Sequence, residues 1–157
     1  MHELQVTPNE TGCFLTLTYN DKYLPQDYSV NKDDPQKFLK RLRQAIAPQK
    51  IRYFLAAEYG DTSWRPHYHL IIFGWDFSQG INYNGQWCGR RQQVQSGEVG
   101  NPYYLSPLVE RLWTFKRTEE SMGHHIIAPF FDLRTQSSLF VTHHQGHWAV
   151  PVQIPHG

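Results

Sequence analysis

The stretch that most constrains the fold is "RPHYHLIIFG", residues 65–74, in which two histidines lead into an apolar run. Successive side chains of a β-strand point to opposite faces, so His67 and His69 share one face and Tyr68 lies on the other. We therefore expect a strand over 67–73 that carries two imidazoles on the same face. Two imidazoles placed in this way can hold one metal ion between them.

The preceding segment offers a third ligand for such an ion. Residues 51–58, "IRYFLAAE", are also predicted to form a strand, and the loop "YGDTSWRP" joins them to the strand at 67–73 as a hairpin with a long connection. Glu58 closes the first strand, which places it on the strand next to His67. Two imidazoles and one carboxylate with open positions suit Mn²⁺, Mg²⁺ or Zn²⁺. The alternative is that both histidines are partly exposed edge residues and that Glu58 is a solvated strand end.

The rest of the chain predicts one further strand, two helices and a long loop. The segment "CFLTLTY", residues 13–19, alternates as a strand does, and a helix with Asp34 as its N-cap is expected to follow. The apolar residues that recur at helical spacing, and so should face the core, are Phe38, Leu39, Leu42 and Ile46. The segment "SPLVERLW", residues 106–113, predicts a short helix capped by Ser106. The Gly-, Gln- and Asn-rich text over 78–102 predicts an extended loop.

Composition limits the possible classes of function. The chain of 157 residues has room for one domain, and no run approaches the roughly 18 apolar residues that a membrane-spanning helix needs. The net charge of +1 does not argue for a nucleic-acid partner, so any basic surface must be local. The N-terminus "MHELQVTPNE" has no signal-peptide pattern, and the lone thiols of Cys13 and Cys88 fit a reducing cytoplasm.

Four segments taken in order, "CFLTLTYND", "DPQKFLKRLRQAI", "EYGDTSWRPHYHLIIFG" and "SPLVERLW", resemble the replication initiator proteins of gokushovirus-like microviruses. These are HUH (His-hydrophobe-His) endonucleases of rolling-circle replication, and the likeness covers roughly residues 10–115. It implies an α+β fold: a central antiparallel sheet flanked by helices, HUH endonuclease-like, with an RRM- or ferredoxin-like core. It also implies a divalent Mg or Mn ion on His67 and His69, with Glu58 as a further ligand.

The resemblance also implies a nucleic-acid partner. We expect the chain to act on single-stranded viral origin DNA with the host replication machinery, in the host cytoplasm and away from any membrane. The residues expected to bind this DNA are Arg65, Lys40 and Arg41, through its phosphates, and Tyr19 and Trp64, by base stacking. The basic residues of the helix are equally consistent with a plain solvated face.

The family's chemistry requires a tyrosine that attacks DNA, and this chain does not show it clearly. The family carries its tyrosine in a "YVARY"-like helix, and no such text follows residue 115. The last tyrosine of the chain is Tyr104, so Tyr103 and Tyr104, with Tyr83 further upstream, are the candidate nucleophiles. The alternative is that the tyrosine pair packs beside the short helix.

We therefore expect a domain over 1–115 and a divergent tail over 116–157. The tail is either disordered or the product of a frameshift near residues 115–123, because a one-base shift with suitable codons turns the text around 137–148 into a tyrosine-containing helix. A zinc-binding tail is the alternative. Its ligands would come from His124, His125, His143, His144 and His147.

Three functions remain open from the sequence. The leading one is an HUH initiator that nicks and rejoins single-stranded origin DNA through a 5′-phosphotyrosine intermediate, and that is inactive if its nucleophile is missing. The second is a module that binds origin DNA without cleaving it. The third is a metal-dependent hydrolase that activates water at the His-x-His site.

Overall fold

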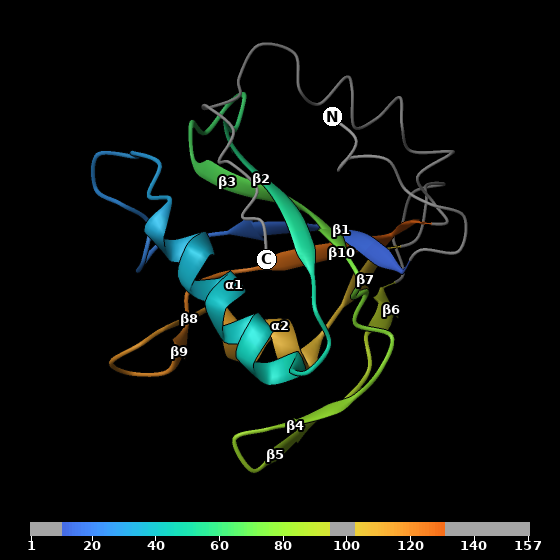
Figure 1. Ribbon diagram of the computed structural model, residues 1–157. Coiled ribbons are helices and arrows are strands. Elements are labelled where there is room, and N and C mark those ends of the chain that lie inside the picture. Colours follow the sequence, from blue (N-terminus) through green and yellow to red (C-terminus); the bar gives the residue numbers. More distant parts are fainter. Residues whose placement is uncertain (1–10, 95–102, 131–157) are drawn as a thin grey trace.

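The computed structural model describes residues 11–94 and 103–130 (Figure 1). In chain order the elements are β1 (Gly12–Thr18), α1 (Asp33–Ile46), β2 (Arg52–Tyr59), β3 (Pro66–Phe73), β4 (Ile81–Tyr83), β5 (Gln86–Cys88), β6 (Gln92–Val94), β7 (Tyr103–Leu105), α2 (Pro107–Leu112), β8 (Thr114–Phe115), β9 (Glu120–Ser121) and β10 (His125–Pro129). They form a mixed α/β structure, which confirms the expected central antiparallel sheet with accompanying helices. No helix in the two described ranges has the length and apolar character needed to cross a membrane.

The main sheet has six strands in the order β2-β3-β1-β10-β7-β6, and every neighbouring pair is antiparallel. The predicted hairpin is confirmed, since β2 and β3 pair along their whole length from Arg52↔Phe73 to Tyr59↔Pro66. The strand that carries the histidine pair also pairs with β1, so it is an internal strand of the sheet. Two further pairs, β4-β5 and β8-β9, form separate two-stranded ribbons.

Both helices cover the same face of this sheet (Figure 1). On that face lie the inward side chains of four neighbouring strands: Leu55 of β2, Leu70 of β3, Leu15 of β1 and Ile127 of β10, each at most 1% exposed. The predicted apolar stripe of α1 is confirmed and packs on them, and the residues of that stripe are Phe38, Leu39, Leu42 and Ile46. Burial of each such side chain stabilises the fold by about 1.5–3 kcal/mol.

The two predicted helix caps had different outcomes. Ser106 caps α2 as expected, because its hydroxyl accepts hydrogen bonds from the backbone amides of Leu108 and Val109. Asp34 does not cap α1, so that prediction is wrong. The helix begins at Asp33 with Lys32 at the N-cap position, two residues earlier than predicted, and the side chain of Asn31 accepts a hydrogen bond from the amide of Asp33.

The segment predicted as an extended loop contains three short strands. β4 and β5 form a hairpin around Asn84 and Gly85, whose φ angles of 51° and 83° lie in the left-handed region. Asn-Gly is the dipeptide that a two-residue hairpin turn favours, because both central positions need φ above zero. β6 then pairs with β7 at the edge of the main sheet, and residues 95–102 lie outside the described part.

The folded domain also continues beyond the boundary predicted at residue 115. β10 lies in the expected tail, yet it pairs with β1 from Cys13↔Pro129 to Leu17↔His125 in the middle of the sheet. The domain therefore extends at least to Phe130. The remaining tail, with most of the proposed zinc ligands, lies outside the described residues.

Candidate functional site

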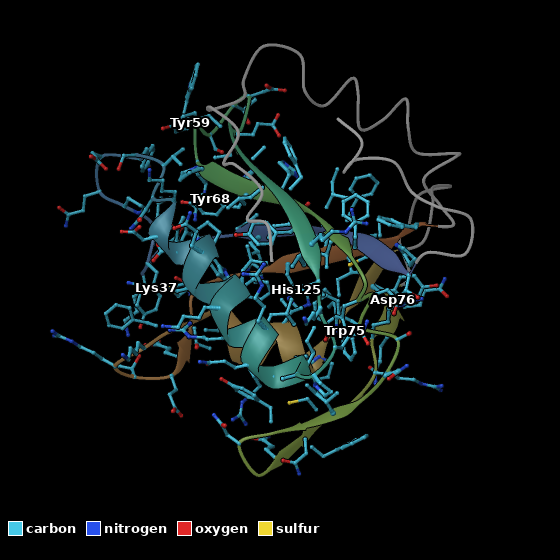
Figure 2. The ribbon with its side chains drawn as sticks, viewed as in Figure 1. Lys37, Tyr59, Tyr68, Trp75, Asp76 and His125 are labelled. Carbon is cyan, nitrogen blue, oxygen red and sulfur yellow. The ribbon has the colours of Figure 1, made fainter. Side chains whose placement is uncertain are left out.

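The β2-β3 hairpin brings the predicted metal ligands to one face of the sheet. Its register sets Glu58 directly opposite His67, and His69 lies opposite Thr16 of the neighbouring strand β1. Tyr68, labelled in Figure 2, points to the helix-covered face. Its ring contacts that of Trp113 there. The alternation of β3 therefore places both histidines on the opposite side, which we call the histidine face.

The centre of the histidine face is a contact between His69 and Glu58. The distance between His69 Nε2 and Glu58 Oε2 is 2.8 Å, and the two residues are only 9% and 4% exposed. The other ring nitrogen, Nδ1, lies 3.2 Å from Thr16 Oγ1. Since a polar group taken out of water needs a partner, these contacts fix the imidazole at both nitrogens. Thr16 was not predicted to be a site residue, although strand alternation places it on this face.

His67 lies on the same face, at its rim, and is half-buried. The nearest loop is shaped to leave room for its ring. A Cβ atom at Gly60 would come within 3.0 Å of Ser63 Oγ and 3.4 Å of His67 Cε1. Glycine at this position therefore allows the β2-β3 loop to close beside the imidazole.

The three predicted ligands do not form a complete metal centre in the described residues. Within 11–94 and 103–130 no group of three or more His, Cys, Asp or Glu side chains is arranged to hold an ion. The contacting pair does fit two ligand positions. Two octahedral ligands at about 2.1 Å from an ion stand about 3 Å apart, close to the 2.8 Å between His69 Nε2 and Glu58 Oε2.

Tyr19 does not lie where a base could stack on it. Tyr19 is only 3% exposed, and its hydroxyl donates a hydrogen bond to Asp34 Oδ2 of α1 at 2.5 Å. Burial and the hydrogen bond to Asp34 raise the pKa of Tyr19 far above its ordinary value. A second hydroxyl contact, at 2.9 Å, joins Tyr19 to Tyr68. The ring therefore belongs to the core on the helix-covered face.

Arg65 and Trp64 lie in the loop between β2 and β3, just before the strand that carries His67. Arg65 donates from Nη1 to Asp21 Oδ1 at 2.7 Å and from Nη2 to the Tyr19 carbonyl at 2.9 Å, so it joins the loop to the end of β1. Trp64 is 57% exposed and has a φ of 57°, a conformation that L-residues rarely adopt. Of the predicted stacking residues, Trp64 is the one with an accessible ring.

The basic residues of α1 are not brought to the histidine face. Lys40 is exposed on the helix, on the other side of the sheet. Arg41 donates from Nη1 to the carbonyls of Leu112 and Thr114, at 3.0 and 2.9 Å, and so holds the end of α2. The sheet lies between both of these side chains and His69.

The candidate nucleophiles also lie away from His69. Tyr104 pairs with Ile127 and faces the helices, with the guanidinium of Arg91 4.8 Å from its ring centroid. Tyr103 points to the histidine face, but β1 and β10 separate β7 from β3. Three strand spacings of about 4.8 Å put its backbone roughly 14 Å from that of β3.

Known proteins similar to the chain are replication-associated proteins. The chain is 30% identical over 125 residues to replication-associated protein VP4 of Bdellovibrio phage phiMH2K, across 75% of this chain and 35% of the relative. It is 35% identical over 75 residues to replication-associated protein ORF4 of Chlamydia phage 1, across 46% of this chain and 18% of the relative. The chain thus spans about a third or less of these relatives. No solved structure matches it.

A family model described as replication-associated protein ORF2 matches residues 12–132. The match runs through the window of 115–123 where a frameshift was hypothesised, and β10 beyond that window pairs with β1. A change of frame inside that window is therefore contradicted. Because the match covers most of the chain and every described element of the main sheet, the chain belongs to this ORF2 family of replication-associated proteins.

Proposed function

We propose that the chain carries the metal site of a rolling-circle initiator that nicks and rejoins single-stranded origin DNA through a 5′-phosphotyrosine intermediate. The observation that carries the proposal is the buried contact of His69 with Glu58 on the face that also presents His67. Membership of the family supports it, as do relatives that are named replication-associated proteins. An HUH endonuclease-like fold with an RRM- or ferredoxin-like core is part of the same proposal.

The contacting pair of His69 and Glu58 fits two ligand positions of a divalent Mg or Mn ion, and His67, at the rim of the same face, would be its third protein ligand. Such an ion supplies Lewis-acid polarisation of the scissile phosphate. Thr16 holds Nδ1 of His69, which keeps Nε2 directed toward the carboxylate. The negative charge of Glu58 offsets part of the charge of a bound cation in this buried position.

The covalent step requires a tyrosine hydroxyl that attacks the scissile phosphorus. The tyrosine hydroxyl gives up its proton as its oxygen forms the new bond to phosphorus, the bond from phosphorus to the 3′ oxygen breaks, and that oxygen takes up a proton, so that no net proton is gained or lost. The products are a 5′-phosphotyrosine and a free 3′-OH. Tyr103 is the candidate on the histidine face and Tyr104 the candidate on the opposite face, and both would need to approach β3 from β7.

The proposed partner is single-stranded viral origin DNA, in the host cytoplasm and together with the host replication machinery. The exposed ring of Trp64 could stack on a DNA base, and it belongs to the loop that leads into the strand with His67 and His69. Stacking on an aromatic ring contributes about 1–3 kcal/mol per base in single-strand binding proteins.

The experiment is to incubate the 157-residue chain with origin-containing single-stranded DNA and Mn²⁺, and to look for a denaturant-resistant adduct. The proposal expects an adduct that His69→Ala abolishes and that His124→Ala, at an exposed histidine outside the site, preserves. Tyr103→Phe and Tyr104→Phe then identify the nucleophile. An adduct that His69→Ala leaves unchanged would refute the proposed site.

A non-cleaving module that binds origin DNA is the second candidate. It is favoured by the distance of Tyr103 from the histidine pair. In that case DNA and Mn²⁺ bind but no adduct forms. Metal-dependent DNA cleavage without an adduct would instead favour a hydrolase that uses activated water.

A further inference from the structure

A cavity of about 390 Å³ lies on the helix-covered side of the domain, away from the histidine face. It is formed where the β4-β5 hairpin, both helices and the β8-β9 ribbon meet. Its lining residues are Arg41, Tyr83, Asn84, Gln86, Arg111, Thr114, Lys116 and Glu119. The proposed metal site and the nucleophile candidates Tyr103 and Tyr104 do not line this cavity, whereas Tyr83, the upstream candidate named from the sequence, does.

The cavity is electropositive. Among the residues that the structure describes, three cationic side chains line it, Arg41, Arg111 and Lys116, against one carboxylate, that of Glu119. The chain as a whole carries a net charge of only +1, so this is a local concentration of positive charge. A cluster of this kind attracts anions, most strongly in a concave site where the field is focused.

Two of these cations are held in place by contacts that leave their charge uncancelled. The Nη1 atom of Arg41 donates to two backbone carbonyls, those of Leu112 and Thr114. The guanidinium of Arg111 lies 5.7 Å from the ring centroid of Tyr83. A carbonyl oxygen and an aromatic ring carry no net charge, so the guanidinium groups keep their positive charge in a defined geometry. Ordering before binding reduces the entropic cost of holding a ligand.

The lining favours the phosphates of a polynucleotide over a free nucleotide. Arginine and lysine side chains bind phosphate oxygens, and a polar wall of Asn84, Gln86 and Thr114 adds hydrogen-bonding groups. A mononucleotide site normally adds an apolar or aromatic surface for the base. Here the one lining ring, Tyr83, is already engaged by Arg111.

We propose that this cavity, formed by Arg41, Arg111 and Lys116 on the helix-covered side, is a second DNA-binding site that holds backbone phosphates of single-stranded DNA. The identity of the ligand rests on the proposed function, whereas the charge and geometry of the site do not. The site would anchor DNA independently of the metal, because it lies across the sheet from His69.

The test measures binding of the full chain to single-stranded oligo-dT, in EDTA and over a series of salt concentrations. In EDTA the result does not depend on the metal site. We expect the double variant Arg111→Gln/Lys116→Gln to weaken binding by about tenfold. It should also reduce the slope of log K against log salt by about 0.7 for each lost phosphate contact. Glu119→Gln, which removes the carboxylate that lines the cavity, should strengthen binding.

Lys50→Gln is the matched control, since Lys50 is an exposed lysine that does not line this cavity. Equal affinity and salt slope in the double variant and in Lys50→Gln would overturn the proposal. A deoxynucleoside triphosphate serves as the competing probe. If the double variant loses triphosphate binding but retains oligo-dT binding, the polynucleotide assignment is refuted. Oligo-dT binding in EDTA reports on this cavity, whereas the Mn²⁺-dependent adduct reports on the metal site, so failure of one site and failure of the other give different results.

Discussion

The two faces of the main sheet each carry a buried polar network, and consecutive residues of β3 supply both. On the helix-covered face the Tyr68 hydroxyl donates to the carbonyl of Asn31 at 2.9 Å, accepts from the amide of Asn31 at 2.9 Å and contacts the Tyr19 hydroxyl. On the histidine face His69 contacts Glu58 and Thr16. The tyrosine network joins the sheet to the segment that enters α1, which the strand ladder does not reach.

The histidine network connects neighbouring strands of the sheet. Glu58, His69 and Thr16 lie on β2, β3 and β1, which backbone pairing already holds together. Its contacts are therefore not needed to choose the topology. The comparison indicates that the tyrosine network on the helix-covered face maintains the fold, while the histidine face carries the side chains available to bind a metal.

The largest expected effect is on metal binding at the histidine face. His69→Ala removes the ligand that contacts Glu58, and we expect Mn²⁺ affinity to fall at least about 100-fold, beyond the loss typical of a supporting residue. Titration of Mn²⁺ followed by electron paramagnetic resonance measures it, with His124→Ala as the control. Unchanged Mn²⁺ affinity in His69→Ala would show that His69 is not a metal ligand.

Lowering the pH should reduce the stability of the fold mainly through His125, which lies on the helix-covered face. Burial, and then the charge of His124, lowers the pKa of His125 to about 4, and its Nε2 accepts a hydrogen bond from the amide of Ser106. In the unfolded chain the His125 imidazole has an ordinary pKa near 6.5. Between pH 6.5 and 4 it therefore binds a proton more tightly in the unfolded chain than in the folded one. Stability is therefore complete above about pH 6.5 and falls by up to about 3 kcal/mol as the pH drops to 4.

Urea unfolding at a series of pH values measures this loss. His125→Gln keeps an acceptor for Ser106 without the titrating group, so its stability should change less across the same pH interval. If the variant and the original chain lose equal stability between pH 6.5 and 4, His125 is not the group responsible.

A smaller effect is expected from Tyr68→Phe, which tests the structural role of the tyrosine network. The substitution leaves the backbone groups of Asn31 and the hydroxyl of Tyr19 without one partner each. We expect a loss of about 1–3 kcal/mol in the free energy of unfolding, with Mn²⁺ affinity unchanged. Denaturant unfolding and metal titration on the same variant give both values. A change in Mn²⁺ affinity without a loss of stability would show that Tyr68 supports the metal site and not the fold.

The smallest effect is expected for Thr16→Val, which keeps the shape of the side chain but removes the contact with Nδ1 of His69. Supporting residues of this kind typically change metal affinity by 10–100-fold, and we expect about tenfold here because the threonine contact, at 3.2 Å, is long. Thr18→Val, at the next position of β1 on the same face, is the matched control. Equal metal affinity in the two variants would show that Thr16 does not orient the ring.

Strand alternation allowed much of this arrangement to be predicted from the sequence. It placed His67 and His69 on one face, and the hairpin put Glu58 beside them. The same rule would have placed Tyr19 with Leu15 and Leu17 on the buried side, where the structure has it, but aromatic character alone suggested a stacking residue.

Other features depend on contacts that local sequence does not reveal. The carbonyl partners of Arg41 lie more than 70 residues away, so its role in holding α2 was not predictable from its helix. β10 was missed because an inward-facing histidine, His125, interrupts the apolar pattern of a short strand. β4-β5 was missed although Asn84-Gly85 is a strong hairpin signal, since polar text surrounds it.

The central claim is that His69 and Glu58 are ligands of one divalent ion on the histidine face. Anomalous scattering from crystals of the chain grown with Mn²⁺ tests it most directly. The account predicts one strong peak within coordination distance of His69 Nε2 and a Glu58 carboxylate oxygen, with His67 turned toward it. A peak at other residues, or none at saturating Mn²⁺, would contradict it.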